Sequence, residues 1–103
     1  MEIIFHAHRA VISPTMRQRA ERHIEKIAGR MRRLVDAVVR FEQDGPVRRV
    51  EVVLHAPRMR PLIGQGFGRT YGPALSEALE NVQSQLAHKK RTPKARKRLA
   101  ARA

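Results

Sequence analysis

The hydrophobic residues of this chain follow two different periods, and the alternation between the periods predicts an order of strands and helices. Ile3, Phe5 and Ala7 recur at every second position, which places them on one face of a first strand. The core should therefore lie under Ile3 and Phe5.

A helical period follows the dipeptide Ser13-Pro14. A serine hydroxyl is suited to cap a helix, and proline is well tolerated at the first helical position. Apolar residues then recur at helical spacing at Met16, Ala20, Ile24, Ile27 and Met31. The opposite face of this predicted amphipathic helix carries a basic stripe of Arg17, Arg19, Arg22, Lys26, Arg30 and Arg33.

Two further alternating runs, residues 35–41 and 50–56, lie on either side of the turn sequence Asp44-Gly45-Pro46. This arrangement predicts an antiparallel hairpin. Residues 60–68 are assigned to a short edge strand, although three glycines lower its strand propensity, namely Gly64, Gly66 and Gly68.

A second helix is predicted from Tyr71 onward. Thr70 is suited to cap it, and Pro73 is tolerated because it falls in the first turn. Its apolar positions are Tyr71, Leu75, Ala78, Leu79, Val82 and Leu86. Thr92-Pro93 is expected to end this helix or to kink it.

Together these patterns predict an α+β domain with the order β-α-β-β-β-α. A helix between the first two strands implies a right-handed crossover and a parallel pair, whereas short turns join the later strands in antiparallel pairs. Both amphipathic helices need one apolar surface, so they should pack on the same face of a four-stranded mixed sheet. We expect a folded domain at residues 1–91 and a basic arm at residues 92–103 that is mobile when free.

The charge of the chain points to a polyanionic partner. Lys and Arg number 22 against 9 Asp and Glu, which gives a net charge of +13, and no acidic residue follows Glu80. Such a single-sign field is typical of RNA-binding proteins. The predicted RNA contacts are the basic positions of the first helix, Arg17, Arg22, Lys26, Arg30 and Arg33, and those of the tail, His88, Lys89, Lys90, Arg91 and Lys94.

The aromatic residues do not suggest stacking on bases. They make up only 4% of the chain, and Phe5, Phe41, Phe67 and Tyr71 are mostly in core-like phase. Recognition of shape and phosphate, as on folded double-stranded RNA, therefore fits better than a stacking platform.

Signals for catalysis are weak. His6 and His8 share a strand face, but they lack a nearby third metal ligand, since His55 need not adjoin them. The Gly64-x-Gly66-x-Gly68 run lacks the lysine and hydroxyl residue of a phosphate-binding loop. Ser76 and Ser84 lack the strand-to-helix elbow of a serine nucleophile. We expect no enzyme activity, metal, cofactor or small-molecule substrate.

Composition and the N-terminal sequence indicate where such a protein works. The chain has no cysteine, which suits a reducing compartment. It shows neither a signal-peptide pattern nor an apolar run long enough to span a membrane. We therefore expect a soluble cytoplasmic protein with no membrane partner.

Several stretches resemble the short ribosome hibernation-promoting factors and the related ribosome-associated translation inhibitors, over about residues 1–91. In the first helix these are Ser13-Pro14-Thr15-Met16-Arg17, Lys26-Ile27 and the basic Arg33. In the second helix they are Tyr71, Ala74-Leu75, Leu79, Val82, Gln85-Leu86 and His88-Lys89-Lys90. The family shares its order of elements with the double-stranded RNA-binding domain.

The resemblance implies a protein that binds rRNA in the decoding channel of the small ribosomal subunit and overlaps the mRNA and tRNA sites. Translation would stop while the ribosome is preserved. Because this chain has no room for the dimerising domain of long family members, ribosome pairing would need a separate factor or would not occur. By this resemblance the expected rRNA contacts are Arg17, Lys26, Arg33, His88, Lys89 and Lys90. Charge alone suggests the further contacts Arg22, Arg30, Arg91 and Lys94.

The sequence departs from the family pattern in two places. Arg69-Thr70 and Gly72-Pro73 surround Tyr71, where the family has an acidic residue and small residues, and Glu80-Asn81 and Ser84 occupy positions that are frequently basic. Two other functions stay open from sequence: a ribosome-assembly or structural ribosomal protein, motivated by the basic tail, and a metal enzyme, motivated by His6 and His8.

Overall fold

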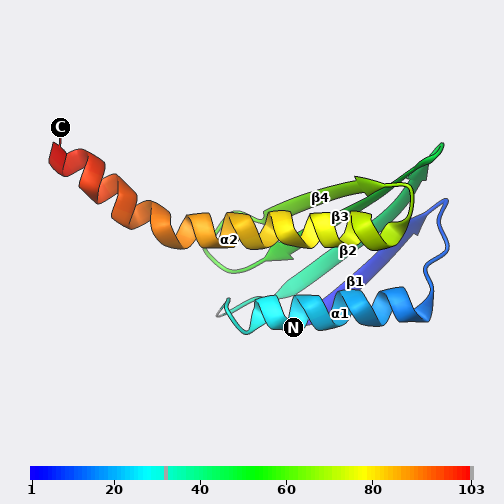
Figure 1. Ribbon diagram of the computed structural model, residues 1–103. Helices are drawn as coiled ribbons and strands as arrows, with labels where there is room; N and C mark the ends of the chain where they lie inside the picture. Colours follow the sequence, from blue (N-terminus) through cyan, green and yellow to red (C-terminus); the bar gives the residue numbers. More distant parts are fainter. Residues whose placement is uncertain (32, 103) are drawn as a thin grey trace.

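The secondary structure elements follow the predicted β-α-β-β-β-α order, with both helices on one face of a single sheet (Figure 1). The computed structural model describes residues 1–31 and 33–102, with side chains described up to residue 87. The elements are β1 (Glu2–His8), α1 (Pro14–Ala28), β2 (Asp36–Asp44), β3 (Val47–His55), β4 (Leu62–Gly68) and α2 (Tyr71–Arg102). The predicted α+β fold is confirmed.

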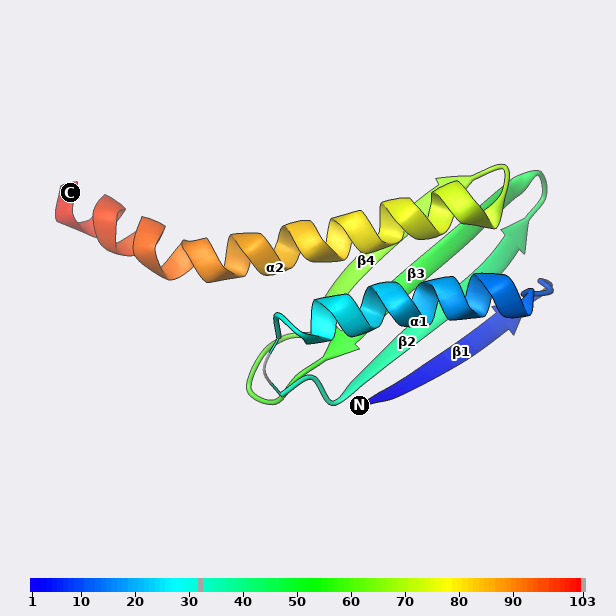
Figure 2. The same ribbon diagram turned by 60° about the horizontal axis from the view of Figure 1, so that its bottom comes forward.

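The sheet has the order β1-β2-β3-β4 and is mixed. Strand β1 pairs with β2 in parallel, because α1 forms the crossover between them, and the other two pairs are antiparallel. The predicted hairpin turn joins β2 to β3 through Gly45, whose φ of +60° suits glycine. Viewed from a second direction, α1 lies over β1 and β2, and α2 lies over β3 and β4 (Figure 2).

The core fills the layer between the sheet and the two helices. Its largest fully buried side chains include Phe41 on β2, Ile24 on α1 and Leu75 on α2. The predicted cap of α1 is present, since Ser13 Oγ accepts a hydrogen bond of 3.1 Å from the Met16 backbone N–H. The predicted apolar faces of both helices are therefore the ones that the fold buries.

Helix α1 ends earlier than its apolar period suggested. The helix stops at Ala28, and Met31 is buried in the following turn, where its N–H donates to the backbone oxygens of Ile27 and Ala28. Arg33 adopts a left-handed φ of 71° as the chain turns toward β2. The sequence-based assignment of Arg30 and Arg33 to the helical stripe was therefore wrong, because the chain has to reverse there to enter the sheet.

The glycines of β4 explain why this strand lies so close to a helix. Gly64 and Gly66 both face the core. A Cβ added to either glycine would collide with backbone atoms of α2, and one added to Gly66 would lie 2.7 Å from Ala78 N. Close backbone packing, and not a phosphate loop, accounts for these glycines. Because they occupy the inner face, Phe67 is on the outer face and 50% exposed, so its predicted core position was wrong.

The outer edge of β4 is closed by side chains of α2. Gln85 Oε1 accepts a hydrogen bond of 3.3 Å from the Ile63 N–H, and Gln85 Nε2 donates to the Ile63 carbonyl at 2.5 Å. Asn81 Nδ2 donates to the Gln65 carbonyl at 2.6 Å. These two side chains take the place of a further strand, which explains why polar amides occupy these helix positions.

Helix α2 continues well past the sheet. It extends through Thr92-Pro93 to Arg102, and its orange part bends after it leaves the sheet (Figure 1). The helix thus does not end at Thr92-Pro93, which was one of the two outcomes expected there; the other was a kink. The mobility of the arm in the free protein stays a prediction.

We expect Gly66→Ala to destabilise the fold by about 2 to 3 kcal/mol, because the new methyl group forces helix and strand apart. Gly29→Ala is the control, since Gly29 has a helical φ of −63° and an added Cβ would be 3.4 Å from its nearest neighbour. The control should change the unfolding free energy by less than about 1 kcal/mol. Urea denaturation measures both, and equal midpoints would contradict the close-packing argument.

The double substitution Asn81→Ala/Gln85→Ala should expose the β4 edge and promote pairing of two copies through this strand. Sedimentation velocity over a range of protein concentrations, at about 0.5 M salt to screen the repulsion between copies, measures the association. Ser84→Ala is the control, because Ser84 is an exposed helix residue beside the same edge. A double variant whose mass is independent of concentration would show that the amides do not guard the edge.

Candidate nucleic-acid interface

The solvent side of α1 presents basic side chains next to α2. Arg19, Arg22 and Lys26 are exposed and line a shallow depression together with Thr15, Gln18 and His23, and Glu25 also borders it. Arg19 crosses to the second helix, where its Nη2 donates a hydrogen bond of 2.9 Å to Ser76 Oγ. The predicted contacts Arg22 and Lys26 are therefore brought together one turn apart on the same exposed surface.

Arg17 lies on a different side of the same helix. Its guanidinium carbon is 5.0 Å from the centroid of the Phe5 ring, which is a cation–π distance. Phe5 in turn stacks on Phe41 with ring centroids 6.4 Å apart. Arg17 is thus exposed but held toward β1, apart from the pair Arg22 and Lys26.

Arg30 and Arg33 are exposed in the turn that follows α1. This turn lies beside the loop between β3 and β4, since the Val35 N–H donates to the His55 carbonyl at 2.8 Å. That loop carries Arg58 and Arg60, both exposed. Sequence analysis missed these two arginines, although their place between Pro57 and Pro61 marked an exposed basic loop.

The second helix leaves the sheet at this same end of the molecule (Figure 2). A hollow between the end of α1 and α2 is lined by Ile27, Arg30, Gln83, Leu86 and Ala87. The backbone of α2 then continues through the predicted tail contacts. The side chains of His88, Lys89, Lys90, Arg91 and Lys94 lie outside the described part of the structure, so their roles stay predictions.

Tyr71 anchors the start of α2 in the core, as the sequence suggested. Its ring packs edge-on against Phe41 at 5.5 Å, and the Arg48 guanidinium lies 5.9 Å from the ring centroid. Burial raises the pKa of Tyr71, and the charge of Arg48 partly opposes this increase. The Tyr71 hydroxyl is buried without a hydrogen-bond partner in the described structure, so the contacts of this residue there are those of packing.

The residues considered for other chemistry are not brought together. His6 and His8 are paired in register with Arg40 and Glu42, whereas His55 lies toward the other end of the strands, 2.5 Å from Asp36. In the described residues there is no group of three or more His, Asp or Glu placed to hold a metal ion. Likewise, no helix in that part of the chain is long and apolar enough to cross a membrane.

Comparison with known proteins identifies the class of fold. No protein-family model matches the chain, and no curated protein sequence matches it significantly. The solved structures that it resembles include a ribosomal subunit interface protein from Coxiella burnetii, with a TM-score of 0.79 and 17% identity over 87% of this chain and 98% of that one. Another is the N-terminal domain of Protein Y from Thermus thermophilus, with a TM-score of 0.73 and 16% identity over 82% of this chain and 94% of that one.

The chain therefore has the fold of ribosomal subunit interface proteins. These structures confirm the fold that the resemblance found in the sequence implied, since they share the chain's arrangement of strands and helices.

We expect Arg22→Ala to weaken binding to duplex RNA and to lower the slope of log K against log salt concentration by about 0.9, the value for one lost phosphate contact. Arg40→Ala is the matched control, because it removes the same charge from an exposed residue on the opposite, helix-free face of the sheet. Fluorescence anisotropy at several salt concentrations measures both variants. Equal slopes for the two would show that only net charge matters.

Proposed function

We propose that this chain is a ribosome-binding translation inhibitor and hibernation factor. It binds rRNA of the small subunit in the decoding channel and excludes mRNA and tRNA. The observation that carries the proposal is a basic surface, formed by α1, the turn after it and the neighbouring loop, on a fold shared with a ribosomal subunit interface protein.

The geometry of this surface supports recognition of RNA by phosphate. Arg22 and Lys26 stand one helical turn apart, about 6 Å, which is close to the spacing of successive phosphates along a strand. Of the aromatic residues, Phe5, Phe41 and Tyr71 pack against one another and against the core, so they offer bases no platform on the helical side. The chain would therefore follow the shape of a folded RNA and not its sequence.

Each basic group has a part in this proposal. Arg22 and Lys26 contact phosphates at the shallow depression on α1, Arg17 extends the surface toward β1, and Arg30 and Arg33 extend it toward the exit of α2. Arg58 and Arg60 join at that end. The extension of α2 adds a second arm of contacts through His88, Lys89, Lys90, Arg91 and Lys94.

The mode of action is steric. A protein bound in the channel by many phosphate contacts occupies the space of mRNA and tRNA without chemical turnover, so no enzyme activity or cofactor is required. We place this action in the cytoplasm, in ribosomes idled by stress or stationary phase. A separate factor would be needed to pair two such ribosomes.

The second candidate is a structural or assembly protein of the ribosome. The long basic extension of α2 favours it, because an arm that reaches past the domain is suited to threading between rRNA segments. The two functions differ in occupancy: an inhibitor binds idle ribosomes, whereas a structural component is present on translating ones.

Sucrose-gradient sedimentation tests the proposal. The full chain is mixed with small subunits at moderate salt, with and without mRNA and initiator tRNA. We expect binding that mRNA and tRNA prevent. Binding that is indifferent to these RNAs would favour the structural component, and failure to co-sediment with small subunits would refute ribosome binding.

The same gradients test the arm. Lys89→Ala/Lys90→Ala/Arg91→Ala should release the chain at lower salt, because three phosphate contacts, each contributing about 0.9 to the salt slope, are lost. An unchanged salt dependence would remove the arm from the interface and leave the surface around α1 as the main contact.

A further inference from the structure

The face of the sheet opposite the helices has no layer over it in the described structure (Figure 2). We call it the open face. Strand register arranges its side chains in rows across the strands. One row is entirely apolar and crosses all four strands through Ile4, Val38, Val53 and Ile63. Ile63 is 47% exposed, so this row ends in hydrophobic surface in contact with water.

The rows on either side of the apolar row are polar. On one side lie Glu2, Asp36 and His55, in register with one another. On the other side His6, Arg40, Glu51 and Gln65 cross the sheet. The apolar row is therefore bordered by carboxylates on both sides.

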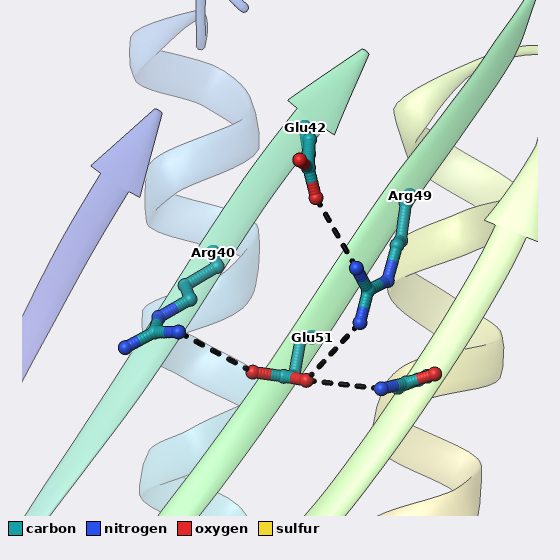
Figure 3. Close-up of polar contacts among 5 residues, drawn as sticks. Arg40, Glu42, Arg49 and Glu51 are labelled. Carbon is teal, nitrogen blue, oxygen red and sulfur yellow. Dashed lines mark hydrogen bonds and ion pairs between the residues drawn. The ribbon is translucent and has the colours of Figure 1, made fainter. Parts of the chain in front are cut away.

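Arg40, Glu51 and Gln65 of this second polar row join Glu42 and Arg49 of the next row in a network of ion pairs and hydrogen bonds (Figure 3). Arg49 contacts Glu42 at 3.2 Å and Glu51 at 3.4 Å, and Arg40 contacts Glu51 at 3.9 Å. Gln65 donates to Glu51 at 3.0 Å. The two arginines of the open face are thus already paired with carboxylates.

Charge separates the open face from the rest of the molecule. Among the side chains that the structure describes, it holds two Lys or Arg residues, namely Arg40 and Arg49. It holds five of the 9 acidic residues, namely Glu2, Asp36, Glu42, Asp44 and Glu51. Asp36 lies 2.5 Å from His55 Nδ1 on this face, and Glu2, its register partner on β1, is exposed to solvent. A net acidic, partly apolar face therefore lies opposite a strongly basic one.

This combination selects the kind of partner. RNA and anionic lipid are repelled by the carboxylates, and a simple cation gains nothing from the apolar row. A second copy brings its own charge of +13 toward the first. The exposed basic side chains of the helices lie beyond the helical layer, more than about 10 Å from the open face, so a short basic partner there is nearer to the carboxylates than to the basic surface.

We propose that the open face binds a Lys/Arg-rich protein segment that presents basic and apolar residues together on one side of its extended chain. Its apolar side chains lie on the row from Ile4 to Ile63, and its basic side chains reach Glu2 and Asp36. Four strands span about 15 Å, which accommodates about five extended residues. The helical surface stays free to hold RNA, so this site is additional to the proposed function and independent of it.

So small a contact gives weak binding, with a Kd of about 10 to 100 μM. The probe is a synthetic eight-residue peptide in which pairs of lysine alternate with pairs of valine, so that each side of the extended chain carries both, and its counterpart has glutamate in place of lysine. Titration into the isotope-labelled full chain at about 50 mM salt, followed by NMR chemical shifts, measures affinity and locates the contact. We expect shifts on the open-face strands with the lysine peptide and none with the glutamate peptide.

Two pairs of variants separate the site from general electrostatics. Glu2→Gln/Asp36→Asn should weaken peptide binding about fivefold to tenfold, whereas Glu25→Gln/Glu80→Gln, with the same change of net charge on the helices, should leave it within about twofold. Ile63→Ser should weaken it similarly, and Val11→Ser, at a residue 92% exposed in a loop, should not. Circular dichroism checks that each variant is folded.

Several outcomes would overturn the proposal. These are shifts confined to the helices, equal losses in both double variants, equal binding of the glutamate peptide, or no binding of the lysine peptide. Duplex RNA that shifts the open-face resonances would assign the face to RNA. A concentration-dependent dimer that Glu2→Gln/Asp36→Asn abolishes would assign it to a second copy of this chain.

Discussion

The close approach of α2 to β4 is the contact on which the rest of this structure depends. Gly64 and Gly66 leave no side chain between strand and helix, so the helix backbone packs directly on the sheet. Only at that distance can Asn81 and Gln85 reach the outer edge of β4. The same packing fixes the line along which α2 leaves the sheet, and with it the place where the basic extension begins.

The second organising constraint is the separation of charge between two layers. Helices on one face of the sheet place Arg19, Arg22 and Lys26 on one side of the molecule, while five carboxylates collect on the other. A chain with a net charge of +13 thus has one surface that attracts phosphate and one that repels it. Such a molecule can meet RNA in one orientation, which a uniformly basic protein could not ensure.

Much of the fold could be predicted, and the errors have specific physical causes. The Ser13 cap, the Gly45 turn and the order of elements were correct because each depends on residues close together in sequence. The end of α1 was placed too late because Met31 keeps the helical period while lying in a turn. Phe67 was assigned to the core because hydrophobicity alone does not reveal that two glycines hold the inner face of β4. Arg58 and Arg60 were overlooked because only folding brings their loop beside Arg33.

The sequence by itself determined the element order, the buried faces of the helices and the strong positive charge, since period, turn chemistry and composition are local properties of the chain. Tertiary structure decided which strand lies next to which helix, how the β4 edge is closed and which arginines share a surface. It also created the rows of the open face, because residues such as Asp36 and His55 become neighbours only through strand register. Those relationships join positions far apart in the chain, and no local pattern encodes them.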